Sequence, residues 1–261
     1  MVTRDPAEGL SVDGVIVTGV AAERVPGVYR AAVADCTGRL PAVFGARLHS
    51  VYLYGSVATG QARPPESDLD LVAVWRSEVI PDEAGVVSGE LSVRYAGLVR
   101  EVSLASATLA QVLAADRAGL GMRCFLRHYC LCLTGTDLRA TLPPCRPSRA
   151  VADGFNDDPA ALVQRWRALL AAARTPTEIA AVARAAARKL LVVAATLESV
   201  EHGGWTTDRA TAAALLTTHH PEWTRTAERA LAWSTNPGLP TTDQVHQLLR
   251  LGDWLATRPT A

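Results

Sequence analysis

The hydrophobic positions of the first half of the chain lie in short runs separated by polar, glycine-containing stretches. Residues 48–54 (LHSVYLY) and 69–75 (LDLVAVW) are the clearest of these runs, and their length and composition are typical of β-strands. Weaker strand patterns cover 91–95, 98–104 and 128–133, and apolar residues recur at helical spacing over 25–40 and 109–120. The first half therefore predicts a mixed sheet with helices packed on it.

The second half lacks strand patterns and is rich in alanine. The segment TLPPCRPSRA, residues 141–150, contains three prolines and is interpreted as a linker. Beyond it, Thr175-Pro176-Thr177-Glu178 forms a capping box with proline at the first helical position, and the helix it opens should run to about Val200. Further helix starts are expected at Pro159, at Thr206 or Thr207, at Pro221 and at Thr241. We therefore predict an α+β fold with two domains, a mixed β-sheet domain over 1–145 and an all-α bundle of about five helices over 151–261.

Two acids lie at the start of the apolar run at 69–75. Asp68 and Asp70 are separated by one leucine, so on a strand both carboxylates leave the same face. Two like charges side by side are unfavourable unless a cation lies between them. Paired carboxylates of this kind are the ligands that Mg²⁺ prefers, together with water and substrate phosphates.

A third acid occurs in the run Leu98–Leu104. Glu101 lies between apolar residues there, where an unpaired charge would be costly to bury. If this run pairs with the strand of Asp68, the three carboxylates meet on one face. Two-metal clamps for displacement at phosphorus use such a set. A salt bridge from Glu101 to Arg94 or Arg100 is the structural alternative.

A glycine and a serine follow the first strand directly. Gly55 lets the backbone approach a phosphate closely, and the Ser56 hydroxyl can donate to a phosphate oxygen. N–H groups at a helix start after this turn, near Val57, would favour an anion. The order strand, Gly-Ser, Asp-x-Asp strand and later strand acid is far more specific than any one of its parts.

This order of motifs resembles the nucleotidyltransferase superfamily that includes DNA polymerase beta, and the two-domain plan looks most like the aminoglycoside adenylyltransferases. The resemblance is strongest over Val51–Leu104. It implies that Asp68 and Asp70 hold Mg²⁺ against the triphosphate of ATP. It also implies that Glu101 acts as the base for a substrate hydroxyl or as a further metal ligand.

The resemblance extends to the helical half through single residues. Arg188 follows Glu178 at the interval seen in streptomycin-modifying members, where the arginine touches phosphate and the acid touches the drug. Lys189, the single lysine of the chain, is a second candidate for phosphate. Those enzymes have a lysine where this chain has Thr207, and Arg209 is the nearest substitute. Trp205 could stack on a base or sugar, although a core position is the alternative.

Charge, cysteine content and hydropathy limit the partners. The chain has 26 basic and 26 acidic residues and five cysteines. Balanced charge in both halves argues against binding of long nucleic acid. An odd number of cysteines without repeated spacing argues against a disulfide framework and favours the cytoplasm. We find neither an apolar run long enough for a membrane span nor a secretion signal.

These observations predict a Mg²⁺-dependent enzyme that transfers AMP from ATP to a hydroxyl of a small molecule, with an aminoglycoside-type antibiotic as the leading acceptor. A monomer and a homodimer are both compatible with the sequence. Two alternatives stay open: a nucleotide-binding regulatory or antitoxin-like module, and nucleotidyl transfer to a protein or RNA acceptor.

Overall fold

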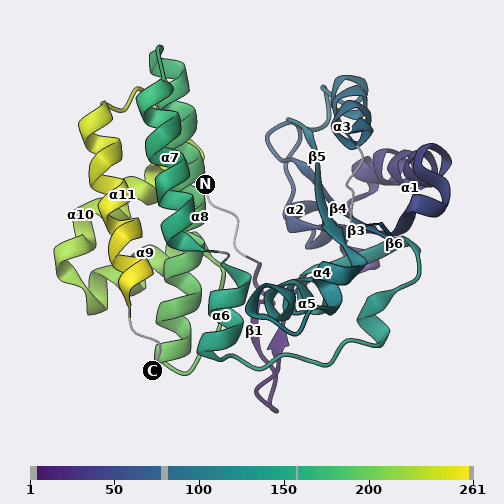
Figure 1. Cartoon of the computed structure of the whole chain (residues 1–261), viewed down its shortest axis with the longest axis horizontal. Coiled ribbons are helices and arrows are strands. Elements are labelled where there is room, and N and C mark those ends of the chain that lie inside the picture. The colour runs from purple at the N-terminus through teal and green to yellow at the C-terminus, as the bar shows by residue number, and fades with distance from the viewer. Residues whose placement is uncertain (1–4, 78–81, 157, 259–261) are drawn as a thin grey trace. The chain divides into compact units, whose positions relative to one another are not determined.

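The chain folds into two compact units. The computed structural model describes residues 5–77, 82–156 and 158–258 (Figure 1). The first unit is Asp5–Arg146, and the second begins at Pro147. The first unit is mixed α/β, and the second is helical.

The first unit is built on a four-stranded sheet with the order β5-β4-β3-β6. Its strands are β3 (Leu48–Tyr54), β4 (Leu69–Trp75), β5 (Val102–Thr108) and β6 (Leu131–Gly135). β3 pairs antiparallel with β4 and β6, whereas β4 pairs parallel with β5. The predicted strands at 48–54 and 69–75 are confirmed with the same bounds, and the sheet is mixed, as expected.

Helices cover both faces of this sheet. They are α1 (Arg30–Phe44), α2 (Gly55–Ala58), α3 (Glu83–Arg94), α4 (Leu109–Leu113) and α5 (Arg117–Tyr129). Short 3₁₀ turns lie at Ala22–Arg24, Gly27–Tyr29, Gly45–Arg47 and Leu138–Ala140, and β1 (Gly9–Leu10) pairs with β2 (Ile16–Val17) in a small separate ribbon.

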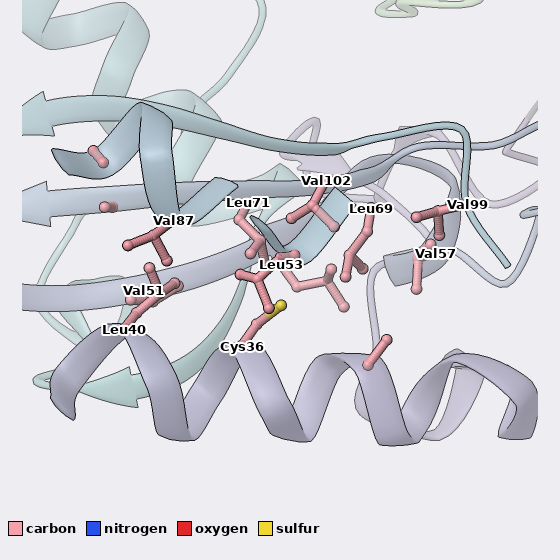
Figure 2. Packing of buried hydrophobic residues seen from close by; sticks show 14 of the residues in the cluster. Cys36, Leu40, Val51, Leu53, Val57, Leu69, Leu71, Val87, Val99 and Val102 are labelled. Atoms are coloured by element: carbon pink, nitrogen blue, oxygen red, sulfur yellow. The ribbon is translucent and has the colours of Figure 1, made fainter. Parts of the chain in front are cut away.

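Strand alternation divides the sheet residues between two cores. On one face, Leu53 and Leu71 belong to one core with Cys36 and Leu40 of α1 and Val87 of α3 (Figure 2). On the other face, Val72 of β4 belongs to a second core with residues of α4 and α5. The second face is the one on which Asp70 lies, because Asp70 and Val72 are two residues apart on β4.

Four of the weaker predictions are wrong in type or in place. Residues 91–95 are not a strand but the end of α3, whose buried Ala84, Val87 and Leu91 follow the helical period. The strand expected over 98–104 begins only at Val102.

The other two errors concern helix and strand ends. The helix expected over 109–120 is broken in two, because Asp116 accepts a hydrogen bond from the Gly119 N–H and starts a new helix. This helix, α5, runs to Tyr129, so the next strand begins at Leu131 and not at His128.

The second unit is an all-α bundle, as predicted. Its helices are α6 (Arg149–Phe155), α7 (Pro159–Ala172), α8 (Pro176–Glu201), α9 (Arg209–His219), α10 (Thr224–Thr235) and α11 (Thr242–Thr257), with a 3₁₀ turn at Pro221–Trp223. The capping box at Thr175 and Glu178 is present, and α8 ends next to Gly203 as expected. Asp208 caps α9, rather than Thr206 or Thr207.

α8 is the central helix of this bundle. It contacts α6, α7, α9, α10 and α11, and its second half is buried almost continuously from Leu190 to Ser199. Among the described residues, no helix is both long enough and apolar enough to span a membrane.

Candidate active site

The two acids of the Asp-x-Asp pattern lie at the start of β4. Asp68 immediately precedes the strand, and Asp70 is its second residue. Asp68 is only 8 % exposed, and its Oδ2 forms an ion pair with Nη2 of Arg100. Its Oδ1 is buried and has no hydrogen-bond partner among the described residues. One oxygen of a buried carboxylate is thus unsatisfied, which is costly in the absence of a further ligand.

Gly55 brings the backbone directly against the second acid. Its φ of 71° lies in the left-handed region, and a Cβ added there would overlap the Oδ2 atom of Asp70. Both the conformation and the space therefore require glycine at this position. The result is a carboxylate that lies directly against bare backbone.

Tyr54 is a neighbour of both acids. It is opposite Asp70 in the β3–β4 register, and Asp70 is paired in turn with Ser103 of β5. Burial is the main cause that raises the pKa of the Tyr54 hydroxyl, and the negative charge of Asp70 adds to it. The phenol is therefore neutral at physiological pH. Its ring packs edge-on against Phe125 of α5 at a centroid distance of 5.0 Å.

Glu101 lies at the same edge of the sheet, directly before β5. The N–H of Leu69 donates to the carbonyl oxygen of Glu101 at 2.9 Å, so Glu101 is next to Asp68 on the neighbouring segment. The next pair in register is Leu69 with Val102, followed by Asp70 with Ser103. Glu101 is exposed, and it does not lie inside a strand as the sequence had suggested. We call Asp68, Asp70 and Glu101 the acid edge.

Ser56 is half-buried at the start of α2. Its carbonyl oxygen accepts from the N–H of Gln61 at 2.8 Å, which closes the turn after β3. None of the residues that the structure describes hydrogen-bonds to its hydroxyl. That hydroxyl is therefore available as a donor or an acceptor for a ligand.

The carboxylate oxygens of the acid edge fit a divalent cation that also keeps water or phosphate as ligands. Asp68 and Asp70 supply carboxylate oxygens, and Oδ1 of Asp68 is buried without a hydrogen-bond partner among the described residues. Asp70 lies directly against the backbone of Gly55, where a side chain would overlap it. Within the described ranges, no three His, Cys, Asp or Glu side chains are arranged so as to hold one metal ion. This pattern suits Mg²⁺, which commonly takes one or two protein carboxylates and completes its shell with water and phosphate.

The helical unit contains a group of three arginines, Arg184 and Arg188 on α8 and Arg209 on α9. Burial, followed by the positive charge of Arg188, lowers the pKa of Arg209 to about 10, with Arg184 contributing in the same direction. Asp208 acts in the opposite direction, but one of its oxygens is engaged in capping α9 through Thr211. We call these three residues the arginine cluster.

Comparison with known proteins identifies the fold. A solved structure of spectinomycin adenyltransferase AAD(9) from Enterococcus faecialis, with ATP and spectinomycin, superposes with a TM-score of 0.57 at 12 % sequence identity. The match covers 86 % of this chain and 98 % of that one. The chain has a nucleotidyltransferase fold. No protein-family model and no curated protein sequence matches it.

Within this nucleotidyltransferase fold, the residues predicted in the helical unit have different surroundings. Arg188 is half-buried, and no ion pair involves it among the described residues. Lys189 is the next residue along α8 and is half-buried. Its role towards phosphate stays a prediction.

Two further predicted residues have structural roles. Glu178 accepts hydrogen bonds from the N–H groups of Arg174 and Thr175, at 2.6 and 2.9 Å, and these bonds lower the pKa of its carboxyl. Its contact with a substrate stays a prediction. Trp205 is 4 % exposed and packs edge-on against Phe155 at 5.8 Å. Trp205 thus has the core position given as the alternative, and its stacking on a base or sugar stays a prediction.

Sequence reasoning missed several residues of the site. Arg100 was considered only as a partner of Glu101, whereas it pairs with Asp68. Tyr54 and Ser103 were not singled out, although strand alternation alone places them on the acid face. Arg184 could have been found from its spacing of four residues to Arg188, which puts both on one face of a helix.

Proposed function

We propose that this protein is a Mg²⁺-dependent adenylyltransferase that transfers AMP from ATP to a hydroxyl group of a small molecule of the aminoglycoside or aminocyclitol class. The observation that carries this proposal is the pairing of Asp68 and Asp70 against the bare backbone of Gly55. The shared fold supports it, because the similar structure of spectinomycin adenyltransferase contains ATP and spectinomycin.

Asp68 and Asp70 would hold the cation. When bound there, Mg²⁺ supplies positive charge that balances the triphosphate and the pyrophosphate leaving group. Gly55 allows the phosphates to approach the backbone without a steric obstacle, and the Ser56 hydroxyl donates to a phosphate oxygen. Tyr54 stays protonated beside the two acids.

Glu101 receives the proton of the acceptor hydroxyl. It is exposed, so its carboxylate can meet a substrate and then release the proton to water. The hydroxyl oxygen attacks the α-phosphorus of ATP, the bond from this phosphorus to the bridging oxygen breaks, and pyrophosphate leaves. Positioning of the two reactants and charge neutralisation supply most of the acceleration.

The arginine cluster is the cationic group of the helical unit that we assign to the triphosphate. Arg188 is the predicted phosphate ligand, and Arg184 and Arg209 are its positively charged neighbours. Guanidinium groups bind phosphate oxygens through paired N–H donors, which favours arginine at such a site.

The direct test is an acceptor screen. The purified protein is incubated with Mg²⁺, ATP and a panel of aminocyclitols, aminoglycosides and lincosamides, and pyrophosphate release is measured together with the mass of the acceptor. We expect one acceptor class to gain a single AMP group. Asp70→Asn should lose this activity by a factor on the order of 1000, because the metal contributes several kcal/mol to such reactions.

Glu90→Gln is the matched control. Glu90 is an exposed acid of α3 that pairs with Arg39, so its loss of charge should leave turnover unchanged. Full activity of Asp70→Asn would contradict the metal assignment. AMP transfer to a protein or RNA in cell lysate, without transfer to any member of the panel, would contradict the small-molecule acceptor while leaving the chemistry in place.

A further inference from the structure

The first residue of β5 has its backbone groups on the open side of the sheet. In the strand order β5-β4-β3-β6, β5 is the outermost of the described strands and pairs with β4 alone. The N–H of Leu69 in β4 donates to the carbonyl oxygen of Glu101 at 2.9 Å. Successive residues of a strand present their backbone groups to opposite sides, so the N–H and C=O of Val102 point away from β4.

Burial denies these backbone groups of Val102 the hydrogen bonds of water. The residue is only 2 % exposed, and it belongs to the same apolar core as Val87 of α3 (Figure 2). An N–H or C=O that is buried without a partner is costly, so both groups need hydrogen bonds from another element. The helix α3 packs on β5 and is the element in reach.

Ser88 and Ser92 of α3 supply both hydrogen bonds. The N–H of Val102 donates to Oγ of Ser92 at 2.9 Å, and the Ser88 hydroxyl donates to the carbonyl oxygen of Val102. The Ser92 hydroxyl donates in turn to the carbonyl oxygen of Ser88 at 2.8 Å, so each proton has an acceptor of its own. The two serines are four residues apart and therefore share one face of the helix. Together they take the place of a further strand at this point of the edge.

These bonds hold the main chain at Glu101 from a second direction. The N–H of Arg100 donates to the carbonyl oxygen of Ser67 at 3.0 Å, and the carbonyl oxygen of Glu101 accepts from Leu69. Both of these bonds are made to β4 and the residues before it, whereas the bonds of Val102 are made to α3. Because the side chain of Glu101 is exposed, its place in the acid edge depends on this main chain.

We propose that Ser88 and Ser92 are positioning residues that hold Glu101 in place for the transfer of AMP. The inference rests on the proposed role of Glu101 as the base that receives the proton of the acceptor hydroxyl. A base must lie within hydrogen-bond reach of that proton, and a displacement of about 1 Å can lower turnover about a hundredfold. The two serines act through the backbone of Val102 and not by contact with the substrate.

The test is a double-mutant cycle on turnover. Ser92→Ala removes the acceptor of the Val102 N–H, and kcat should fall about tenfold with an unchanged KM for ATP, because a base acts in the chemical step. In the Glu101→Gln protein, Ser92→Ala should cause less than about a twofold further loss, since the group that Ser92 positions is already absent. An equal loss in both backgrounds would overturn the proposal, because general damage to the fold would act in both.

Three further variants bracket this result. Ser88→Ala should lower kcat in the same way, whereas Ser92→Thr keeps a hydroxyl and should restore kcat to nearly the native value. Thr37→Ala is the matched control, since it removes a hydroxyl of α1 that donates to the carbonyl oxygen of Val33 at 2.7 Å, four residues earlier on the same helix. It should leave kcat unchanged. A loss in Thr37→Ala as large as that in Ser92→Ala would contradict the assignment.

Amide hydrogen exchange tests the same hold without a substrate. In Ser92→Ala the N–H of Val102 should exchange faster, and so should that of Leu69, whose acceptor is the carbonyl oxygen of Glu101. Thr37→Ala should change neither rate. Unchanged exchange at Leu69 would overturn the inference even if the native protein transfers AMP. Faster exchange at Leu69 in a protein that transfers no AMP would count against the proposed function alone and support the hold on Glu101.

Discussion

The acid edge and the arginine cluster handle unbalanced charge in opposite ways. At the acid edge, Arg100 pairs with Asp68 from within the same unit, and Oδ1 of Asp68 is buried without a hydrogen-bond partner among the described residues. In the arginine cluster, burial and then the positive charge of Arg188 lower the pKa of Arg209. One region thus pairs opposite charges, whereas the other brings like charges together.

This difference indicates how the binding of a ligand would change the charge balance of each region. At the acid edge, Arg100 leaves one buried oxygen of Asp68 for an external ligand. In the arginine cluster, burial and neighbouring positive charge disfavour the charged form of Arg209, which is a cost in stability. Functional sites often carry such a cost, and its removal by mutation tends to raise stability and lower activity together. Three variants test this comparison.

Gly55→Ala should have the largest effect, and it acts on the acid edge. The new methyl group would overlap Asp70 Oδ2 at a φ that L-residues rarely adopt. We expect a loss of turnover on the order of a hundredfold from displacement of the carboxylate, together with a loss of roughly 2 kcal/mol in the free energy of unfolding. Turnover is measured by pyrophosphate release and stability by urea unfolding.

Gly85→Ala is the control for this change. Gly85 lies in α3 with open space around its Cα, so alanine should be neutral or slightly stabilising there. If Gly55→Ala is as active as Gly85→Ala, the backbone of Gly55 has no part in holding Asp70.

Arg188→Met should affect stability and ATP use with opposite signs. Removal of one positive charge relieves Arg209, so the unfolding temperature should rise. Loss of a charged hydrogen bond to phosphate should raise the KM for ATP by about tenfold. Arg165→Met, at an exposed position of α7, should change neither value. A fall in the unfolding temperature with an unchanged KM for ATP would show that the arginine cluster is structural.

Arg100→Met should have the smallest effect of the three. It leaves the buried carboxylate of Asp68 without its cation, which we expect to cost about 1–2 kcal/mol, since the arginine is itself a third exposed. Addition of Mg²⁺ without ATP should restore more of the unfolding free energy in this variant than in the native protein. Arg94→Met, which breaks the exposed pair with Asp35, is the comparison. An equal Mg²⁺ response in both variants would exclude Asp68 as a cation ligand.

The parts of the fold that local patterns determine were predicted well. β3 and β4 are short apolar runs bounded by turn residues, and α8 has a capping box and a glycine stop, so their bounds follow from the sequence. The end of α3 was predicted as a strand because the apolar positions of the short window 91–95 fit both the helical and the strand period. Only the burial of Ala84 and Val87, a turn or more earlier, shows the helix.

The same distinction applies to the site. Asp68, Asp70 and Gly55 come from one hairpin, where alternation and turn geometry suffice to bring them together. Arg100 and Arg209 gain their roles through neighbours that are distant in sequence, and the burial of Trp205 depends on Phe155 in another helix. Such contacts come from tertiary packing, which the spacing of hydrophobic and polar residues along one sequence does not reveal.

The pairing of β4 with β5 has a consequence for how this protein tolerates change. The register that places Val102 in the apolar core also places Glu101 next to Asp68. A slip of one residue would turn Val102 out of that core and present a neighbour of opposite or no charge to Asp68. The burial of Val102 thereby also keeps Glu101 beside Asp68. The length of the connection before β5 is under the same constraint, because a change in it would shift this register.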